Sequence, residues 1–162
     1  MTVLEVKNLK KIYRPRFGGN QVQALSRVTF SVEEGEYVAI MGESGSGKTT
    51  LLNIMAALDK PTEGVVCLDG KPLSSVKEKD IAQFRRDNLG FVFQEFNLLD
   101  TFNLKDNILL PLVLKGVPYK EMPGKLLPIA RELGIESLLE KYPYEVSGGQ
   151  KQRAAAARAL IT

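Results

Sequence analysis

Gly42-Glu43-Ser44-Gly45-Ser46-Gly47-Lys48-Thr49-Thr50 is the stretch that decides the fold of this chain. It matches the pattern G-x-x-x-x-G-K-[S/T], in which a glycine-rich loop leads into a helix and binds phosphate. The apolar segment 37–41 precedes it and indicates a buried parallel strand. Residues 50–58 follow it with apolar side chains at helical spacing. The motif therefore lies between a predicted strand and a predicted helix, as a phosphate-binding loop must.

Each residue type in this loop has a chemical reason to be there. The glycines have no Cβ, so the backbone can take positive φ and turn its N–H groups toward phosphate oxygens, beside the positive end of a helix. Lys48 is expected to reach the β- and γ-phosphates, and the Thr49 hydroxyl to bind Mg²⁺. A glycine-rich turn that matches by chance is the alternative. The predicted nucleotide-binding residues of the loop are Gly42, Ser44, Gly45, Ser46, Gly47, Lys48, Thr49 and Thr50.

Composition excludes several other classes of site. The chain has 162 residues, a net charge of +3 and 44% hydrophobic residues, which fits one globular domain. It contains no histidine and one cysteine, Cys67, so Ser-His catalytic pairs, internal disulfides and multi-cysteine metal sites are excluded. No apolar run approaches the ~18 residues that span a bilayer, and the N-terminus does not resemble a signal peptide. We expect a cytosolic protein with at most peripheral membrane contact and no nucleic-acid partner.

Hydrophobic patterns divide the chain into a strand-rich first part and a helical second part. They predict strands at 2–7, 22–32, 37–41, 65–68 and 90–93. They predict helices at 76–86, 104–114, 122–133, 137–141 and 151–161, beside the helix that follows the phosphate loop. We therefore expect one α/β domain over residues 1–162, with a β-rich core at 1–94 and a helical subdomain at 95–162.

A second glycine motif, Ser147-Gly148-Gly149-Gln150, precedes the alanine-rich helix 151–161. Ser147 can cap that helix. The amides of Gly148 and Gly149 at its N-terminus can form a second anion site. Alone, this motif would be explained equally well as an ordinary helix cap. Two such sites, far apart along one chain, need a common explanation.

Together these residues resemble the ATP-binding domain of ABC transporters. Tyr13 falls where the family has its adenine-stacking aromatic, and Gln94 at the glutamine of its Q-loop. Residues 146–150 resemble the family's signature motif, with Val146 in place of the usual leucine. By themselves, Tyr13 could be a packing residue and Gln94 a polar strand end. The resemblance implies a P-loop NTPase core with a mixed sheet, an antiparallel β subdomain on the N-terminal side and an inserted helical subdomain.

The resemblance also implies why one chain has two anion sites. In the family, two domains form a head-to-tail dimer, and each ATP lies between the phosphate loop of one copy and the signature motif of the other. Lys48 and Gln94 are then implied as catalytic residues, and Thr49 and Gln94 as ligands of Mg²⁺. Ser147 and Gly149 are implied to contact the γ-phosphate across the dimer. The implied nucleotide-binding residues outside the phosphate loop are Tyr13, Gln94, Ser147, Gly148, Gly149 and Gln150.

The resemblance implies a membrane partner as well. Segment 96–144 is implied to dock on a membrane-spanning permease subunit, on the cytoplasmic face of the cell membrane. Segments 93–100 and 106–112, with the insertion 14–21, resemble the branch of lipoprotein-release and macrolide-export ATPases, and most of all the bacitracin-type antimicrobial-peptide transporters.

The family continues past the position of Thr162, into a strand with the Walker B aspartate, the catalytic glutamate and, later, a switch histidine. We therefore expect an N-terminal fragment whose C-terminal core is missing, which binds ATP without turnover and either self-associates or leaves its sheet incomplete. Two other functions stay open. One is a non-transport ABC ATPase that acts on DNA or ribosomes, and the other is a non-hydrolytic nucleotide-binding module.

Overall fold

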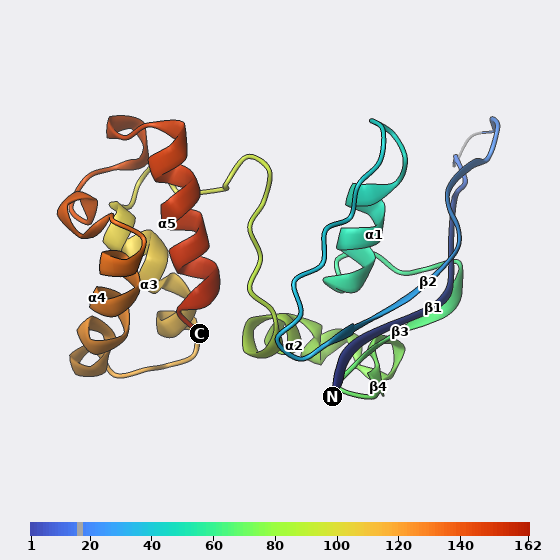
Figure 1. Cartoon of the computed structure of the whole chain (residues 1–162), viewed down its shortest axis with the longest axis horizontal. Helices are drawn as coiled ribbons and strands as arrows, with labels where there is room; N and C mark the ends of the chain where they lie inside the picture. The colour runs from blue at the N-terminus through green and yellow to red at the C-terminus, as the bar shows by residue number, and fades with distance from the viewer. Residues whose placement is uncertain (16–17) are drawn as a thin grey trace. The chain divides into compact units, whose positions relative to one another are not determined.

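The computed structural model describes residues 1–15 and 18–162. Arg16 and Phe17, which belong to the predicted insertion 14–21, lie outside the described residues. The chain folds into two compact units, Met1–Ala82 and Gln83–Thr162 (Figure 1). The first unit contains the phosphate loop, and the second contains Gln94 and the motif 147–150.

The first unit is an antiparallel sheet with one helix packed on it. Its strands are β1 (Thr2–Tyr13), β2 (Val22–Glu33), β3 (Glu63–Leu68) and β4 (Lys71–Pro72), in the order β2-β1-β3-β4. The helix is α1 (Lys48–Met55), which buries Leu51 and Ile54 against the sheet. The buried cluster of this unit consists of Val6, Leu9, Leu25, Leu51, Ile54 and Val66.

Strand β1 is longer than the predicted segment 2–7 and continues to Tyr13. Its pairing with β2 shifts register between Val6 and Leu9 and again between Leu9 and Lys11. Such bulges interrupt the alternation of apolar and polar side chains that the prediction depended on, while the strand itself continues. After β4 the chain forms the 3-10 turn η1 (Leu73–Ser75). The helix predicted at 76–86 is instead the 3-10 turn η2 (Glu78–Asp80) followed by the helix α2 (Ile81–Asn88), which ends two residues later than predicted.

Two predicted strands are not strands in the structure. Segments 37–41 and 90–93 are irregular, and Tyr37 and Met41 are 95% and 88% exposed. A strand is defined by hydrogen bonds to a neighbouring strand, and the sheet formed by the described residues includes no partner for either segment. The α/β class and the antiparallel β subdomain are confirmed, but the parallel strands expected of a mixed sheet do not form within residues 1–15 and 18–162.

The second unit is a bundle of three helices, α3 (Leu104–Leu114), α4 (Met122–Glu132) and α5 (Gly148–Leu160). Alanines 154 and 157 of α5 are fully buried against the other helices, since their small side chains permit close packing. The predicted helix 137–141 is instead the 3-10 turn η4 (Glu136–Leu138), because so short a segment cannot sustain α-helical cooperativity. The remaining 3-10 turns are η3 (Tyr119–Glu121) and η5 (Pro143–Glu145). Among the described residues, no helix has both the length and the apolar composition needed to cross a bilayer.

Candidate functional site

The phosphate loop ends on Gly47, the N-terminal cap of α1. Gly47 has φ of 92° and Gly45 of 80°, both in the left-handed region that favours glycine. A Cβ on Gly47 would lie 2.3 Å from the carbonyl oxygen of Ala24 in β2. Glycine is therefore required at position 47 both by the backbone angle and by the close approach to the sheet.

The Lys48 side chain curls back over this loop. Its ammonium donates to the carbonyl oxygens of Gly42 (2.8 Å) and Glu43 (2.6 Å) and lies 3.3 Å from the Ser46 hydroxyl oxygen. The first N–H groups of any helix lack intrahelical acceptors, and the first turn of α1 contains no acidic residue. The ammonium, the free amides and the helix dipole thus form a positively charged concave loop that is suited to phosphate.

The same residues fit a nucleotide-bound Mg²⁺ ion. Thr49 is exposed at the second position of α1, so its hydroxyl is accessible as one hard oxygen ligand. The part of the chain that the structure describes contains no group of three or more His, Cys, Asp or Glu placed to hold a metal. This donor set suits Mg²⁺ that takes most of its ligands from phosphate oxygens and water.

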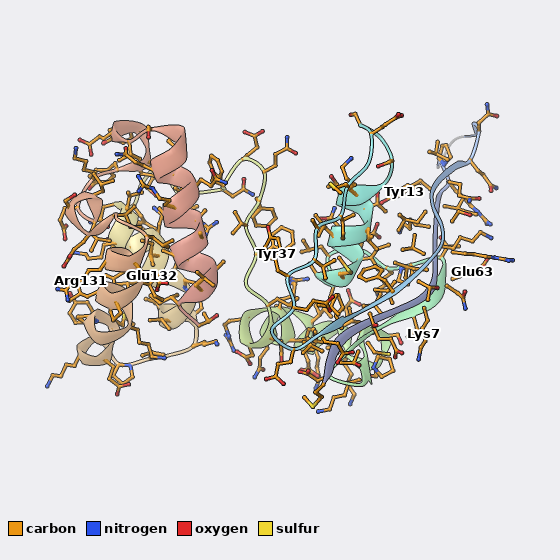
Figure 2. The ribbon with its side chains drawn as sticks, viewed as in Figure 1. Lys7, Tyr13, Tyr37, Glu63, Arg131 and Glu132 are labelled. Carbon is orange, nitrogen blue, oxygen red and sulfur yellow. The ribbon has the colours of Figure 1, made fainter. Side chains whose placement is uncertain are left out.

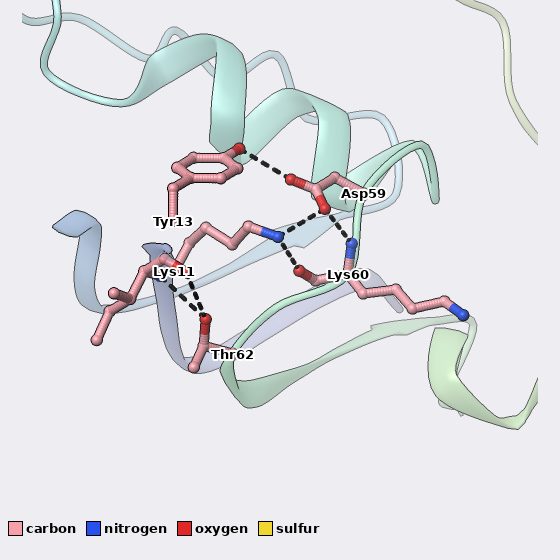
Figure 3. Close-up of polar contacts among 6 residues, drawn as sticks. Lys11, Tyr13, Asp59, Lys60 and Thr62 are labelled. Carbon is pink, nitrogen blue, oxygen red and sulfur yellow. Dashed lines mark hydrogen bonds and ion pairs between the residues drawn. The ribbon is translucent and has the colours of Figure 1, made fainter. Parts of the chain in front are cut away.

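Tyr13 lies at the end of β1 and points toward α1 (Figures 2 and 3). Its hydroxyl donates to Asp59 Oδ2 at 2.9 Å, and the Lys11 ammonium lies 4.8 Å from the ring centroid. The same ammonium donates to Asp59 Oδ1 at 2.6 Å. Sequence reasoning missed Lys11 and Asp59, because no motif joins residues 48 positions apart along the chain.

Gln94 lies in an exposed turn of the second unit, just before a strained segment. Phe96 and Asn97, which follow it, have φ of 60° and 44°, unusual for residues with a Cβ. Arg158 of α5 donates to both of their carbonyl oxygens, at 2.6 Å and 2.7 Å. Burial lowers the pKa of the Arg158 guanidinium from its ordinary value. The segment after Gln94 is therefore fixed to the helix that begins at the second glycine motif.

The motif 147–150 forms a capping box. The Ser147 hydroxyl oxygen accepts from the Gln150 N–H at 3.3 Å, and Gln150 Oε1 accepts from the Ser147 N–H at 2.8 Å. Gly148 and Gly149 are exposed, and a Cβ on either would meet no atom within 4 Å. The amides of the two glycines and the Ser147 hydroxyl proton therefore stay open to an anion, while Gln150 holds the cap.

The structure brings the predicted site residues together in two groups. In the first unit, β1 ends at Tyr13, and the paired strand β2 carries the Ala24 carbonyl that touches Gly47 of the phosphate loop. In the second unit, Arg158 joins the segment after Gln94 to α5. Each unit thus contributes one helix N-terminus suited to an anion, at the start of α1 and of α5.

Comparison with known proteins gives consistent matches. The family described as ABC transporter matches residues 25–162. The bacitracin export ATP-binding protein BceA of Halalkalibacterium halodurans is 50% identical over 161 residues, which are 99% of this chain and 63% of that protein. The lipoprotein-releasing system ATP-binding protein LolD of Blochmanniella floridana is 41% identical over 93% of this chain and 64% of its own length.

A solved structure agrees with these matches. The ATP-binding cassette MJ0796, in a dimeric post-hydrolysis state bound to ADP and Pi, has a TM-score of 0.87 and 40% identity, over 98% of this chain and 69% of that one. The present chain spans a little over three fifths of the length of curated relatives that it matches, since it covers 63% of BceA and 62% of the ABC transporter ATP-binding protein YvcR of Bacillus subtilis.

Proposed function

The chain belongs to the ABC transporter family, and from this premise we propose that it is the ATP-binding portion of a longer, transport-coupled ATPase. The observation that carries the proposal is the phosphate loop with the Lys48 ammonium folded over it, at the free N-terminus of α1. The second helix N-terminus, at residues 147–149, is a second group suited to an anion, and relatives that match 99% and 93% of this chain are named as ATP-binding proteins, which supports the same proposal.

We propose that the two anion sites act on one nucleotide in a dimer. In the proposed arrangement, Lys48 and the amides of the phosphate loop hold the β- and γ-phosphates in one copy. The Ser147 hydroxyl and the Gly149 amide of a second copy contact the γ-phosphate from the other side. The dimeric relative bound to ADP and Pi supports the pairing of two copies.

Hydrolysis would require more than these groups. A bound Mg²⁺ neutralises charge on the β- and γ-phosphates during phosphoryl transfer. In this chain the Thr49 hydroxyl would bind that ion, Gln94 would reach the ion and the attacking water, and Lys48 would stabilise charge on the phosphates. Since the chain matches 69% of the MJ0796 cassette, we propose that the 162-residue chain binds ATP and that turnover needs residues outside this match.

The transport role follows from the relatives. BceA is named for bacitracin export and LolD for lipoprotein release, so we propose that the parent protein powers export or release, with antimicrobial peptides as the first candidate substrate. The helical second unit would dock on a membrane permease, and its exposed Val113, Leu114 and Tyr119 suit an apolar partner surface. The protein would then act on the cytoplasmic face of the membrane.

Isothermal titration of Mg-ATP, with hydrolysis assayed on the same sample, tests the nucleotide site. We expect the wild-type chain to bind, and Lys48→Ala to lose at least about tenfold in affinity because a charge-assisted contact to phosphate is removed. Lys79→Ala is the matched control, since it removes one positive charge from an exposed position in the same unit. Equal affinity in Lys48→Ala and Lys79→Ala would contradict the proposed site. ATP turnover that Lys48→Ala abolishes would show that the chain alone is catalytic.

A further inference from the structure

We infer that Lys11 and Asp59 are positioning residues, which hold the Tyr13 ring as a platform on which the base of the nucleotide stacks. The inference rests on the proposed nucleotide site and adds two residues to it. Neither residue was found in the sequence patterns, and neither belongs to the phosphate loop. The contacts that carry the inference all lie in the first unit (Figure 3).

The Tyr13 ring is held at two points. Its hydroxyl donates to Asp59 Oδ2 at 2.9 Å, which fixes the far end of the side chain. The Lys11 ammonium lies over the ring, 4.8 Å from the centroid, within the range of a cation–π contact. Tyr13 nevertheless keeps 43% of its surface exposed. One ring face is therefore occupied by the ammonium, while Tyr13 keeps exposed surface on which a planar base could stack.

The carboxylate that anchors the ring is itself fixed. Asp59 Oδ1 accepts from the Lys11 ammonium at 2.6 Å and from the Lys60 N–H at 2.7 Å. Burial raises the pKa of Asp59, but the hydrogen bonds from Lys11, Tyr13 and the Lys60 N–H outweigh it and hold that pKa below its ordinary value. Asp59 is therefore ionised at neutral pH and accepts from both neighbours.

The Lys11 ammonium is equally constrained. It also donates to the Lys60 carbonyl oxygen at 2.6 Å, and its side chain is only 12% exposed. Lysine side chains usually extend into water, so this one has lost its conformational freedom to make three contacts. Exposed ion pairs contribute little to stability. The loss of side-chain entropy at Lys11 is therefore hard to explain if its contacts with Tyr13, Asp59 and Lys60 only join two surface segments.

The contacts among Lys11, Tyr13 and Asp59 also fix the position of the Tyr13 ring relative to the phosphate loop. Asp59 lies four residues after the end of α1 at Met55, and α1 begins at the phosphate loop. Tyr13 pairs with Val22 of β2, about 7 Å along the strand from Ala24. The Ala24 carbonyl oxygen is the atom that a Cβ on Gly47 would meet at 2.3 Å. A nucleotide whose phosphates lie at the start of α1 therefore has Tyr13 within reach of its base.

The test separates base binding from phosphate binding in the 162-residue chain. Mg-ATP and Mg-tripolyphosphate are titrated calorimetrically into the wild type, Tyr13→Ala, Tyr13→Phe and Asp59→Asn. The ratio of the two affinities measures what the base adds. We expect Tyr13→Ala to lower this ratio about tenfold, the usual worth of one base stacked on an aromatic ring. Asp59→Asn and Tyr13→Phe should each lower it about threefold, because the ring remains but is no longer anchored.

Tripolyphosphate affinity should stay within about twofold of wild type in all three variants, since none removes a phosphate contact. Glu63→Gln is the matched control. This substitution weakens the ion pair between Glu63 and Lys10 (2.8 Å), where Lys10 is the residue before Lys11 in β1. The ion pair does not include Tyr13, so the ratio of ATP affinity to tripolyphosphate affinity should stay unchanged.

Two results would overturn the inference. If Asp59→Asn lowered the affinities for ATP and for tripolyphosphate by the same factor, the contacts among Lys11, Tyr13 and Asp59 would only support the fold. An unchanged ratio in Asp59→Asn and Tyr13→Phe would mean that the ring needs no anchor. Failure of the wild type to bind either ligand is a different outcome, which would overturn the proposed nucleotide site and this inference with it.

Discussion

Position 47 shows how strongly single residues are constrained where the phosphate loop meets the sheet. Gly47 combines φ of 92° with a backbone approach so close that a Cβ would lie 2.3 Å from the Ala24 carbonyl oxygen and 2.9 Å from Leu25 Cδ2. Gly45, two residues earlier, has φ of 80° but open space around the place of a Cβ. The two glycines therefore separate the cost of a left-handed backbone from the cost of a steric clash.

We expect Gly47→Ala to destabilise the chain by at least about 3 kcal/mol, because strain and a clash with immobile backbone add together. Gly45→Ala should cost only about 1 kcal/mol, from the left-handed conformation alone. Urea denaturation of both variants measures the difference. Similar costs for the two substitutions would mean that β2 can move away from the loop.

The candidate-site residues also divide by how they can be found in a sequence. The glycines and Lys48 lie within one short motif whose chemistry is local, so the pattern alone locates the loop at the start of a helix. Lys11 and Asp59 are 48 positions apart and meet only because β1 and the end of α1 are brought together by folding. No spacing rule reports such a contact, and that part of the candidate site could not be predicted.

At the scale of the elements, the three helices of the second unit were predictable, whereas the short helix expected at 137–141 and two strands were not. Helix α3 has the predicted bounds, 104–114, because Asn103 caps it and Gly116 follows its end. A helix satisfies its own backbone, so local signals suffice to define it. Segments 37–41 and 90–93 have strand-like composition, but a strand also depends on a neighbour elsewhere in the chain. The described residues provide none, and both segments stay irregular.

Asn107 of α3 holds the segment between Gln94 and that helix. It is fully buried, accepts from the Leu99 N–H at 2.7 Å, and donates to the carbonyl oxygens of Leu99, Phe102 and Asn103 at 3.0 to 3.1 Å. With the Arg158 contacts to residues 96 and 97, these bonds fix the chain from position 96 to 103 on the helical unit. Gln94 itself lies just outside the fixed segment.

We expect Asn107→Ala to destabilise the helical unit by about 3 kcal/mol, because the Leu99 N–H and the Phe102 carbonyl oxygen lose their side-chain partner and the fully buried side chain leaves a cavity. Asn103→Ala, which removes the side-chain cap that accepts from the Asp106 N–H at 2.8 Å and an exposed hydrogen bond to Glu140 at 3.3 Å, should cost about 1 kcal/mol. Denaturation followed by far-ultraviolet circular dichroism compares them. A cost for Asn107→Ala no greater than that of the cap would show that water replaces its bonds.

At the scale of the whole molecule, the described residues form two buried clusters, one in each unit, and each unit contains a helix N-terminus suited to an anion. The buried cluster of the first unit is built from β-strands and α1, and that of the second from α3, α4 and α5. Both clusters are small, which limits the stability of each unit. A ligand that binds the phosphate loop stabilises the unit that contains the loop.

This division predicts how the chain responds to nucleotide. Hydrogen exchange in urea should show separate unfolding of residues 1–82 and 83–162, with Leu9→Ala weakening the first and Ile108→Ala the second, each by about 3 kcal/mol. Mg-ATP at a hundredfold excess over its dissociation constant should stabilise the first unit, which contains the phosphate loop, by about 2.7 kcal/mol. Lys48→Ala should remove that gain. Protection of residues 1–82 that stays unchanged when Mg-ATP is added to the wild type would contradict this prediction, because the phosphate loop would then not bind the nucleotide.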